Sequence, residues 1–115
     1  MDARAVQRLL EKTYGLAETA LTVGAKASEA ALRDARLSDS VKQKLIPLYG
    51  EESLRRTMNY AGLGLAICRV IEAELDDEAA REQLELYRVR LQAIYDNART
   101  AFDKEFANSH ALEPE

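Results

Sequence analysis

Apolar residues recur at intervals of three and four positions along almost the whole chain, and this spacing is the strongest constraint on its fold. The clearest stretches run from Val6 to Ala31 and from Ala80 to Ala101. Such spacing gathers apolar side chains on one face of an α-helix, whereas a half-buried strand would alternate apolar and polar residues. The sequence therefore predicts an all-α fold.

The composition agrees with a small helical domain. Apolar residues make up 47% of the 115 positions, mostly as Ala and Leu, with only five Gly and two Pro. Ala and Leu are strong helix formers, and a turn-rich β-sandwich would need more Gly and Pro. A chain of this length buries one modest core, so we expect a single domain over 1–107. The periodicity ends there, and 108–115 is expected to be a flexible tail.

Start and stop signals divide the chain into three long helices and one short connecting helix. Asp2 and Ser38 are suitable N-caps, and the stripe that includes Leu9, Leu16 and Val23 should face the core. Pro47 should end the connecting helix, because a residue before proline avoids the α conformation. The predicted helices are 3–36, 39–46, 51–75 and 78–107, with the first continuing through Gly15; two shorter helices are the alternative there.

The expected turns predict an antiparallel bundle. Asp76 and Asp77 form a tight turn, so the last two long helices should be antiparallel, and the first and last should run parallel. Gly24 and Gly62 then come level, which predicts a close helix crossing or, alternatively, room for a ligand. Glu72 should form an interhelical ion pair, because the same arrangement brings it level with Arg81.

The third long helix carries more apolar surface than one packing face can use. A second apolar stripe lies nearly opposite its core face, and the last helix has a similar stripe away from its main seam. A helix that is apolar on all sides must be covered on all sides. We therefore expect the bundle to be completed by self-association, most simply as a homodimer; the alternative is coverage by the first helix and the connector within one protomer. The predicted interface residues are Leu63, Ile67, Val70, Leu86, Val89 and Ala93.

The sequence offers few residues that could catalyse a reaction or bind a cofactor or a metal ion. The one histidine, His110, lies in the tail, and the one cysteine, Cys68, falls on a core stripe. The sequence therefore predicts no metal, no cofactor and no catalytic residue. The alternative is a small-molecule-binding bundle or enzyme with an inter-helix pocket near Gly62. Its pocket residues would be Asn59, Tyr60, Glu72, Arg81 and Arg88.

Charge and hydropathy limit the classes of molecule that the protein is expected to bind. A net charge of -4 without a dense Lys/Arg block argues against nucleic-acid binding, which stays as the weaker alternative. The longest apolar run, 61–68, is far shorter than the roughly 20 residues of a membrane span. A single cysteine and no signal segment predict a cytoplasmic protein. The predicted function is non-catalytic: a self-associating, coiled-coil-like bundle that binds a protein partner or serves as a structural subunit.

Overall fold

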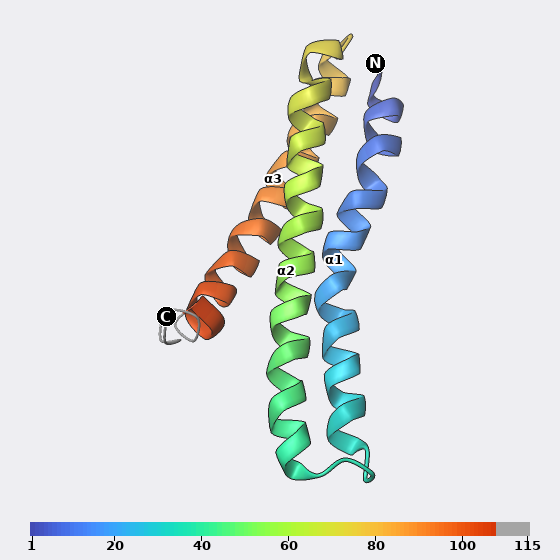
Figure 1. The fold of residues 1–115 in the computed structure, drawn as a ribbon. Coiled ribbons are helices and arrows are strands. Elements are labelled where there is room, and N and C mark those ends of the chain that lie inside the picture. The colour runs from blue at the N-terminus through green and yellow to red at the C-terminus, as the bar shows by residue number, and fades with distance from the viewer. Residues whose placement is uncertain (108–115) are drawn as a thin grey trace.

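Three long helices form the part of the chain that the computed structural model describes, residues 1–107 (Figure 1). α1 spans Ala3–Arg33, α2 spans Asp39–Ile71 and α3 spans Glu78–Phe102. A 3-10 turn, η1 (Glu72–Glu74), follows α2, and a π-helical turn, η2 (Asp103–Ala107), follows α3. These residues contain no strand, which confirms the all-α prediction. The predicted tail at 108–115 lies outside the described residues.

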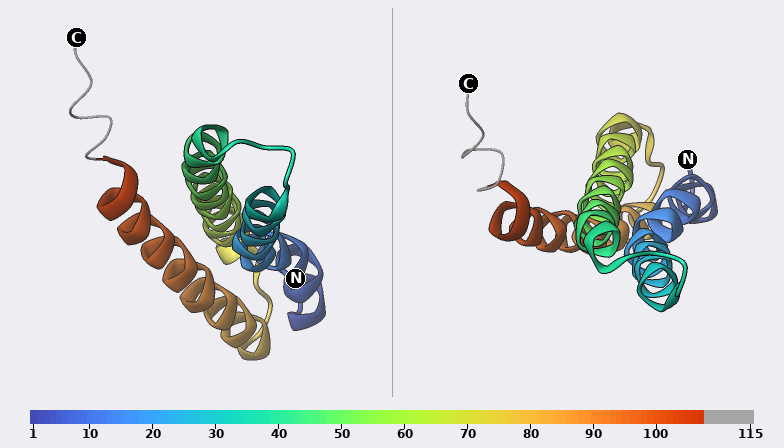
Figure 2. Two further views of the ribbon diagram at one scale, coloured as in Figure 1. Left: turned by 90° about the horizontal axis from the view of Figure 1, so that it is seen from below. Right: turned by 60° about the horizontal axis from the view of Figure 1, so that its bottom comes forward.

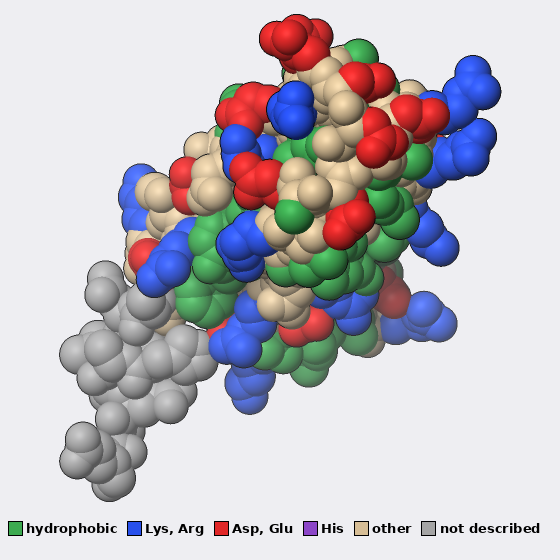
Figure 3. All heavy atoms as spheres, turned by 90° about the horizontal axis from the view of Figure 1, so that it is seen from above, with side chains coloured by type: hydrophobic (Ala, Val, Ile, Leu, Met, Phe, Trp, Pro, Cys, Tyr) green, Lys and Arg blue, Asp and Glu red, His purple; other side chains and the backbone are tan. Residues whose placement is uncertain are grey.

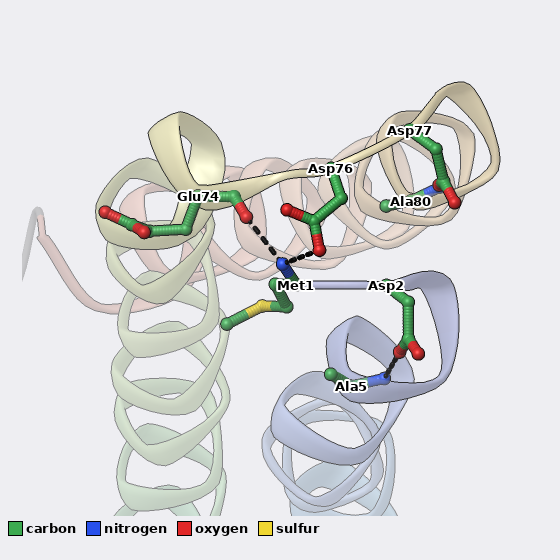
Figure 4. A network of polar contacts seen from close by, with 7 residues as sticks. All are labelled: Met1, Asp2, Ala5, Glu74, Asp76, Asp77 and Ala80. Carbon is green, nitrogen blue, oxygen red and sulfur yellow. Dashed lines mark hydrogen bonds and ion pairs between the residues drawn. The ribbon is translucent and has the colours of Figure 1, made fainter.

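Polar side chains begin all three helices. Asp2, Ser38 and Asp77 each accept a hydrogen bond from the backbone N–H three residues later, at 2.9, 3.2 and 2.8 Å respectively. Each bond satisfies a donor that has no partner inside its helix. Figure 4 shows the cap residues Asp2 and Asp77 at the same end of the molecule. The caps at Asp2 and Ser38 are the predicted ones, whereas Asp77 was expected in the turn and also caps α3.

α2 runs without a break through Pro47 and Gly50, so the predicted connecting helix and third long helix are one helix. Pro47 deprives the Gln43 carbonyl of its helical donor, but both residues are exposed and water can reach that oxygen. α1 holds α2 on both sides of the proline. Before it, Lys42 Nζ donates to the Leu32 carbonyl at 2.8 Å, and after it the segment around Ser53 contacts α1. The predicted exit at Pro47 is wrong because tertiary contacts outweigh the local penalty.

The topology is the predicted one. α1 and α2 form an antiparallel hairpin, and α3 returns beside α2 in the same direction as α1 (Figure 1). α3 leaves the hairpin at an angle, and its end lies well away from the loop that joins α1 to α2 (Figure 2). The molecule is consequently elongated, with principal extents of 58 × 34 × 17 Å.

The core lies where all three helices meet, toward the end that holds the N-terminus. Its most deeply buried large side chains include Leu10 of α1 and Leu91 of α3. Only part of the predicted α1 stripe is buried: Leu9, Leu16 and Val23 are 45%, 40% and 61% exposed. Leu10 occupies the centre of the packing face instead, so the apolar stripe of α1 is wider than the surface its neighbours cover.

Gly24 fixes the point along α1 at which α2 packs most closely against it. A Cβ atom on Gly24 would lie 1.5 Å from Ser53 Oγ and 2.6 Å from Ser53 Cβ, so a side chain cannot fit there. Gly62 was the predicted neighbour of Gly24, but the nearest atom to its Cβ position belongs to the Tyr95 ring, at 3.9 Å. The predicted crossing is wrong because the chain turns back before Asp39, with no connecting helix of its own.

The same register holds at the far end of the hairpin. Met1 lies 23 positions before Gly24, and Asp76 lies 23 positions after Ser53. These two ends meet: the Met1 ammonium donates to the Asp76 carboxylate and, at 2.8 Å, to the Glu74 carbonyl. The Asp76 N–H donates to the Met1 carbonyl at 3.1 Å (Figure 4). α1 and α2 therefore keep one register over about six helical turns.

The Gly24 contact predicts an unusually costly glycine-to-alanine substitution. Gly24→Ala should lower the free energy of unfolding by about 1–3 kcal/mol, because Ser53 and the α2 backbone must move away. Gly15→Ala is the matched control, since nothing lies within 4 Å of its Cβ position. It should raise stability by roughly 0.5–1 kcal/mol through helix propensity. Urea denaturation followed by circular dichroism measures both.

A rescue variant separates this clash from a general effect on α1. Ser53→Gly removes both atoms that the new methyl group would strike. The double variant should therefore regain part of the stability lost in Gly24→Ala. Equal responses of Gly24→Ala and Gly15→Ala would contradict the close approach.

Replacing Pro47 should have the opposite effect on the free energy of unfolding. A proline inside a helix costs about 3 kcal/mol relative to alanine, so Pro47→Ala should raise the free energy of unfolding by about 1–3 kcal/mol. The melting temperature should rise by several degrees in a thermal scan, at about 4 °C per kcal/mol for a domain of this size. An unchanged or lower melting temperature would show that α2 does not need the missing hydrogen bond at Gln43.

Candidate functional site

One exposed apolar stripe follows α1. Leu9, Leu16 and Val23 are seven positions apart, so they share one flank of the helix. At 100° per residue, Leu16 lies about 80° to one side of Gly24, which faces α2. Tyr14, whose ring meets Tyr87 of α3 edge-on at 5.8 Å, lies about 80° to the other side. The stripe is therefore beside α2 and turned away from α3.

A second stripe on α2 borders the first. Leu63 and Val70 are 54% and 75% exposed, and Ile67 between them is partly buried. Leu63 lies about 80° from Ser53, the residue that meets α1, on the side opposite Glu72, which reaches α3. Both stripes thus lie on one surface of the α1–α2 hairpin. We call this surface the hairpin face: Leu9, Leu16, Val23, Leu63, Ile67 and Val70.

The stripe predicted on the last helix is also exposed, but it belongs to a different surface. Leu86 and Val89 are 43% and 58% exposed, and Ala93 is exposed too. Val89 lies about 160° around α3 from Leu91, whose side chain fills the core. The α3 stripe therefore points away from the other two helices and does not join the hairpin face.

A long open trough lies where α3 diverges from the hairpin. It consists of a cleft of about 690 Å³ and a smaller one of about 300 Å³, and they share Leu21, Leu54 and Ala101. The smaller cleft begins at Tyr14, and the larger one ends at Phe106 of η2. Sequence reasoning missed this site. The signal was present in α1 as a further spacing of four, three and four: Leu21, Ala25, Ser28 and Leu32.

The trough is apolar, with acidic groups at its edges. Glu18 lines the smaller cleft and accepts a hydrogen bond from the Tyr14 hydroxyl at 3.0 Å. Burial, followed by this hydrogen bond to Glu18, raises the pKa of Tyr14. Glu105 lines the larger cleft. The charged side chains of residues 1–107 that line the two clefts are these carboxylates.

The five residues of the predicted ligand pocket are divided by the structure. Glu72, Arg81 and Arg88 line one small depression of about 210 Å³ between η1 and α3. Asn59 is exposed and Tyr60 is half-buried, and neither lines that depression. Thirteen positions of continuous helix separate Asn59 from Glu72, or about 20 Å. The group near Gly62 and the group near Glu72 therefore do not form one pocket.

Arg88 bridges two helices in that depression. It pairs with Glu72 of η1 at 3.6 Å and with Glu85 of α3 through a closer contact. Hydrogen bonding to Glu85 and the two negative charges raise the pKa of Arg88. Glu72 was predicted to pair with Arg81, and the structure instead pairs it with Arg88, which lies seven residues, or about two helical turns, further along α3. All three side chains are substantially exposed, so the bridge contributes about 1 kcal/mol at most.

Acidic side chains gather at this end of the molecule, where α2 leads into α3 (Figure 3). They do not form a metal site: residues 1–107 hold no group of three His, Cys, Asp or Glu side chains placed to share an ion. His110 lies outside the described residues. Every buried side-chain nitrogen or oxygen within 1–107 has a hydrogen-bond partner.

The remaining comparisons concern known proteins and membranes. Models of protein families, curated proteins and solved structures were compared with this chain, and none of them matches it. No helix within 1–107 combines the length and the apolar character needed to cross a membrane.

Cys68 predicts how stability depends on pH. It is 1% exposed, and burial raises the pKa of its thiol above the value of about 8.5 expected in the unfolded chain. Above that pH the unfolded chain loses the proton while the folded protein keeps it. The free energy of unfolding should therefore hold below about pH 8 and fall by roughly 1 kcal/mol toward pH 9.5.

Urea denaturation of wild type and Cys68→Ala at pH 7 and 9.5 checks this. The variant should be less stable at both pH values, because it lacks the buried sulfur, but it should lose less between them. Tyr14 and Tyr87 also have raised pKa values through burial, and they are common to both proteins. The same loss in both proteins would show that the thiol does not contribute.

Proposed function

We propose that this chain is a non-catalytic, self-associating helical protein in which two copies pair through the hairpin face. The observation that carries the proposal is the exposure of this face: Val23, Leu63 and Val70 are each more than half exposed. Scattered exposed apolar residues are normal, but six apolar residues gathered on one side of two neighbouring helices favour an interaction site. Burying it against a second copy removes this surface from water, which favours association.

The geometry of the hairpin face suits a two-fold pair. α1 and α2 are antiparallel and in fixed register, so Leu16 and Leu63 lie near the same height on neighbouring helices. Two such faces stacked on each other place four helices around one new core, the arrangement of a four-helix bundle. Each copy supplies three side chains from each helix. The proposed cytoplasmic location rests on the single cysteine, which fits a reducing compartment.

The small-molecule alternative has less support. Its five residues divide between two places on α2 and α3, and Arg88 is already engaged by Glu72 and Glu85. The depression that holds these charges has a volume of only about 210 Å³, smaller than a typical ligand pocket. Substrate binding and catalysis need convergent groups in a shielded site, so we favour an interaction role.

The molar mass in solution tests the proposal. Wild type should sediment with about twice the chain mass of 12.9 kDa. Leu63→Glu combined with Val70→Glu should give a folded monomer, because two carboxylates buried without partners weaken association by at least about 100-fold. Both positions are exposed within one copy, so the far-UV circular dichroism should not change.

Leu86→Glu combined with Val89→Glu is the matched control. It makes the same kind of change at two exposed positions of α3, and the dimer should persist. A monomer from this control alone would move the interface to the α3 stripe and overturn its assignment to the hairpin face. A monomeric wild type at micromolar concentration would overturn self-association itself.

A further inference from the structure

We propose that the trough between the hairpin and α3 binds an amphipathic helix of another protein, with Lys or Arg beside its apolar stripe. This inference concerns a surface separate from the hairpin face, and it goes beyond the proposed self-association. It rests on the shape of the trough, on the small residues along its floor and on the sign of the charge at its edges.

The dimensions of the trough fit a helix. Along α1 its lining runs from Tyr14 to Ser28, which is about 21 Å at 1.5 Å per residue. Along α3 and η2 it runs from Ile94 to Phe106, a similar length. About four turns of a docked helix would fill this span. The combined clefts hold several large apolar side chains, in the manner of known helix-in-groove sites.

The floor of the trough is made of residues with little or no side chain. Gly24, Ala25 and Ser28 of α1 line it beside Gly50 and Ser53 of α2. Small residues allow another helix to approach closely, as they do between α1 and α2 at Gly24. Larger apolar side chains form the walls, and these can take up the i, i+3, i+4 stripe of a docked helix.

The negative charge at the edges of the trough favours a docked helix with basic flanks. Glu18 lies along the α1 edge and Glu105 along the η2 edge. Glu11 and Glu29 are seven positions before and eleven after Glu18, so they continue the same flank of α1. A docked helix with Lys or Arg at its flanks would meet carboxylates on both sides, whereas acidic flanks would be repelled.

Tyr14 occupies a fixed position at the end of the trough nearest the core. Tyr14 lines this end, and its ring packs edge-on against that of Tyr87 with 5.8 Å between the ring centroids. The Tyr14 hydroxyl also holds Glu18 by a 3.0 Å hydrogen bond, so this carboxylate is oriented before any partner arrives. A preorganised charge lowers the ordering cost of binding.

A pair of designed peptides tests the inference. The probe is a fluorescent helix of about 18 residues, long enough to be helical in isolation, with an Ala/Leu stripe flanked by Lys. The control peptide is identical except that Glu replaces every Lys. Fluorescence anisotropy with the full chain at low and moderate salt should show binding of the Lys peptide, and at least about tenfold weaker binding of the Glu peptide.

Ala25→Lys is the decisive variant. Ala25 is exposed and lines the trough, so a lysine there blocks the floor without entering the core. Binding of the Lys peptide should fall by at least about tenfold. Ala30→Lys is the matched control, because Ala30 is an exposed alanine of α1 that does not line the trough. It lies seven positions after Val23, on the flank of the hairpin face, so the comparison concerns peptide binding alone, which should equal that of wild type. Glu18→Lys combined with Glu105→Lys should reverse the preference in favour of the Glu peptide.

The outcomes separate this inference from the self-association. Leu63→Glu with Val70→Glu should leave peptide binding unchanged even where it abolishes the dimer. Equal binding of the two peptides, or equal binding by Ala25→Lys and Ala30→Lys, would overturn the inference. A dimer that dissociates in Ala25→Lys would also overturn it, because the trough would then be occupied by a second copy of this chain.

Discussion

The close approach of Gly24 to Ser53 is the contact on which the rest of the structure depends. Because no side chain fits between these residues, α1 and α2 lie almost backbone to backbone at this point. The contact fixes both the separation and the register of the hairpin. The register then brings Met1 beside Asp76 at the far end, where the termini of α1 and α2 meet the start of α3. The hairpin also keeps α2 straight through Pro47, since both halves of α2 are held against one continuous helix.

A hairpin held this tightly leaves apolar surface that its own chain does not cover. α3 is shorter than α1 and α2 and leaves them at an angle, so it completes a core only toward one end (Figure 1). Besides the exposed stripe on α3 itself, two apolar surfaces remain: the hairpin face, turned away from α3, and the trough, opened by the divergence of α3. Each surface has a different character: the hairpin face is broad and built from branched apolar side chains, whereas the trough has a floor of small residues and acidic edges. These differences support two different partners, a second copy and a basic amphipathic helix.

The polar groups of residues 1–107 serve mainly to hold the helices. Asp2, Ser38 and Asp77 cap them, and Arg88 joins α3 to η1 through Glu72. Cys68 is buried and keeps its proton, so it packs as a small apolar residue. The Arg88–Glu72 ion pair is exposed and adds little stability. We therefore assign the proposed recognition to the apolar surfaces, with charge acting at their edges.

The sequence by itself determined the helical character of the chain, the caps at Asp2 and Ser38 and the antiparallel order of the long helices, because periodicity, capping and tight turns act within one or two turns of chain. It also indicated an excess of apolar surface at Leu63, Val70, Leu86 and Val89, which the structure leaves exposed. Only the tertiary structure decided that α2 passes through Pro47, that Gly24 meets Ser53 instead of Gly62, and that Glu72 pairs with Arg88 instead of Arg81. Each of these depends on the register between helices. A register is set by contacts between residues distant in the chain, and a local pattern carries no information about which of several apolar flanks such contacts will bury.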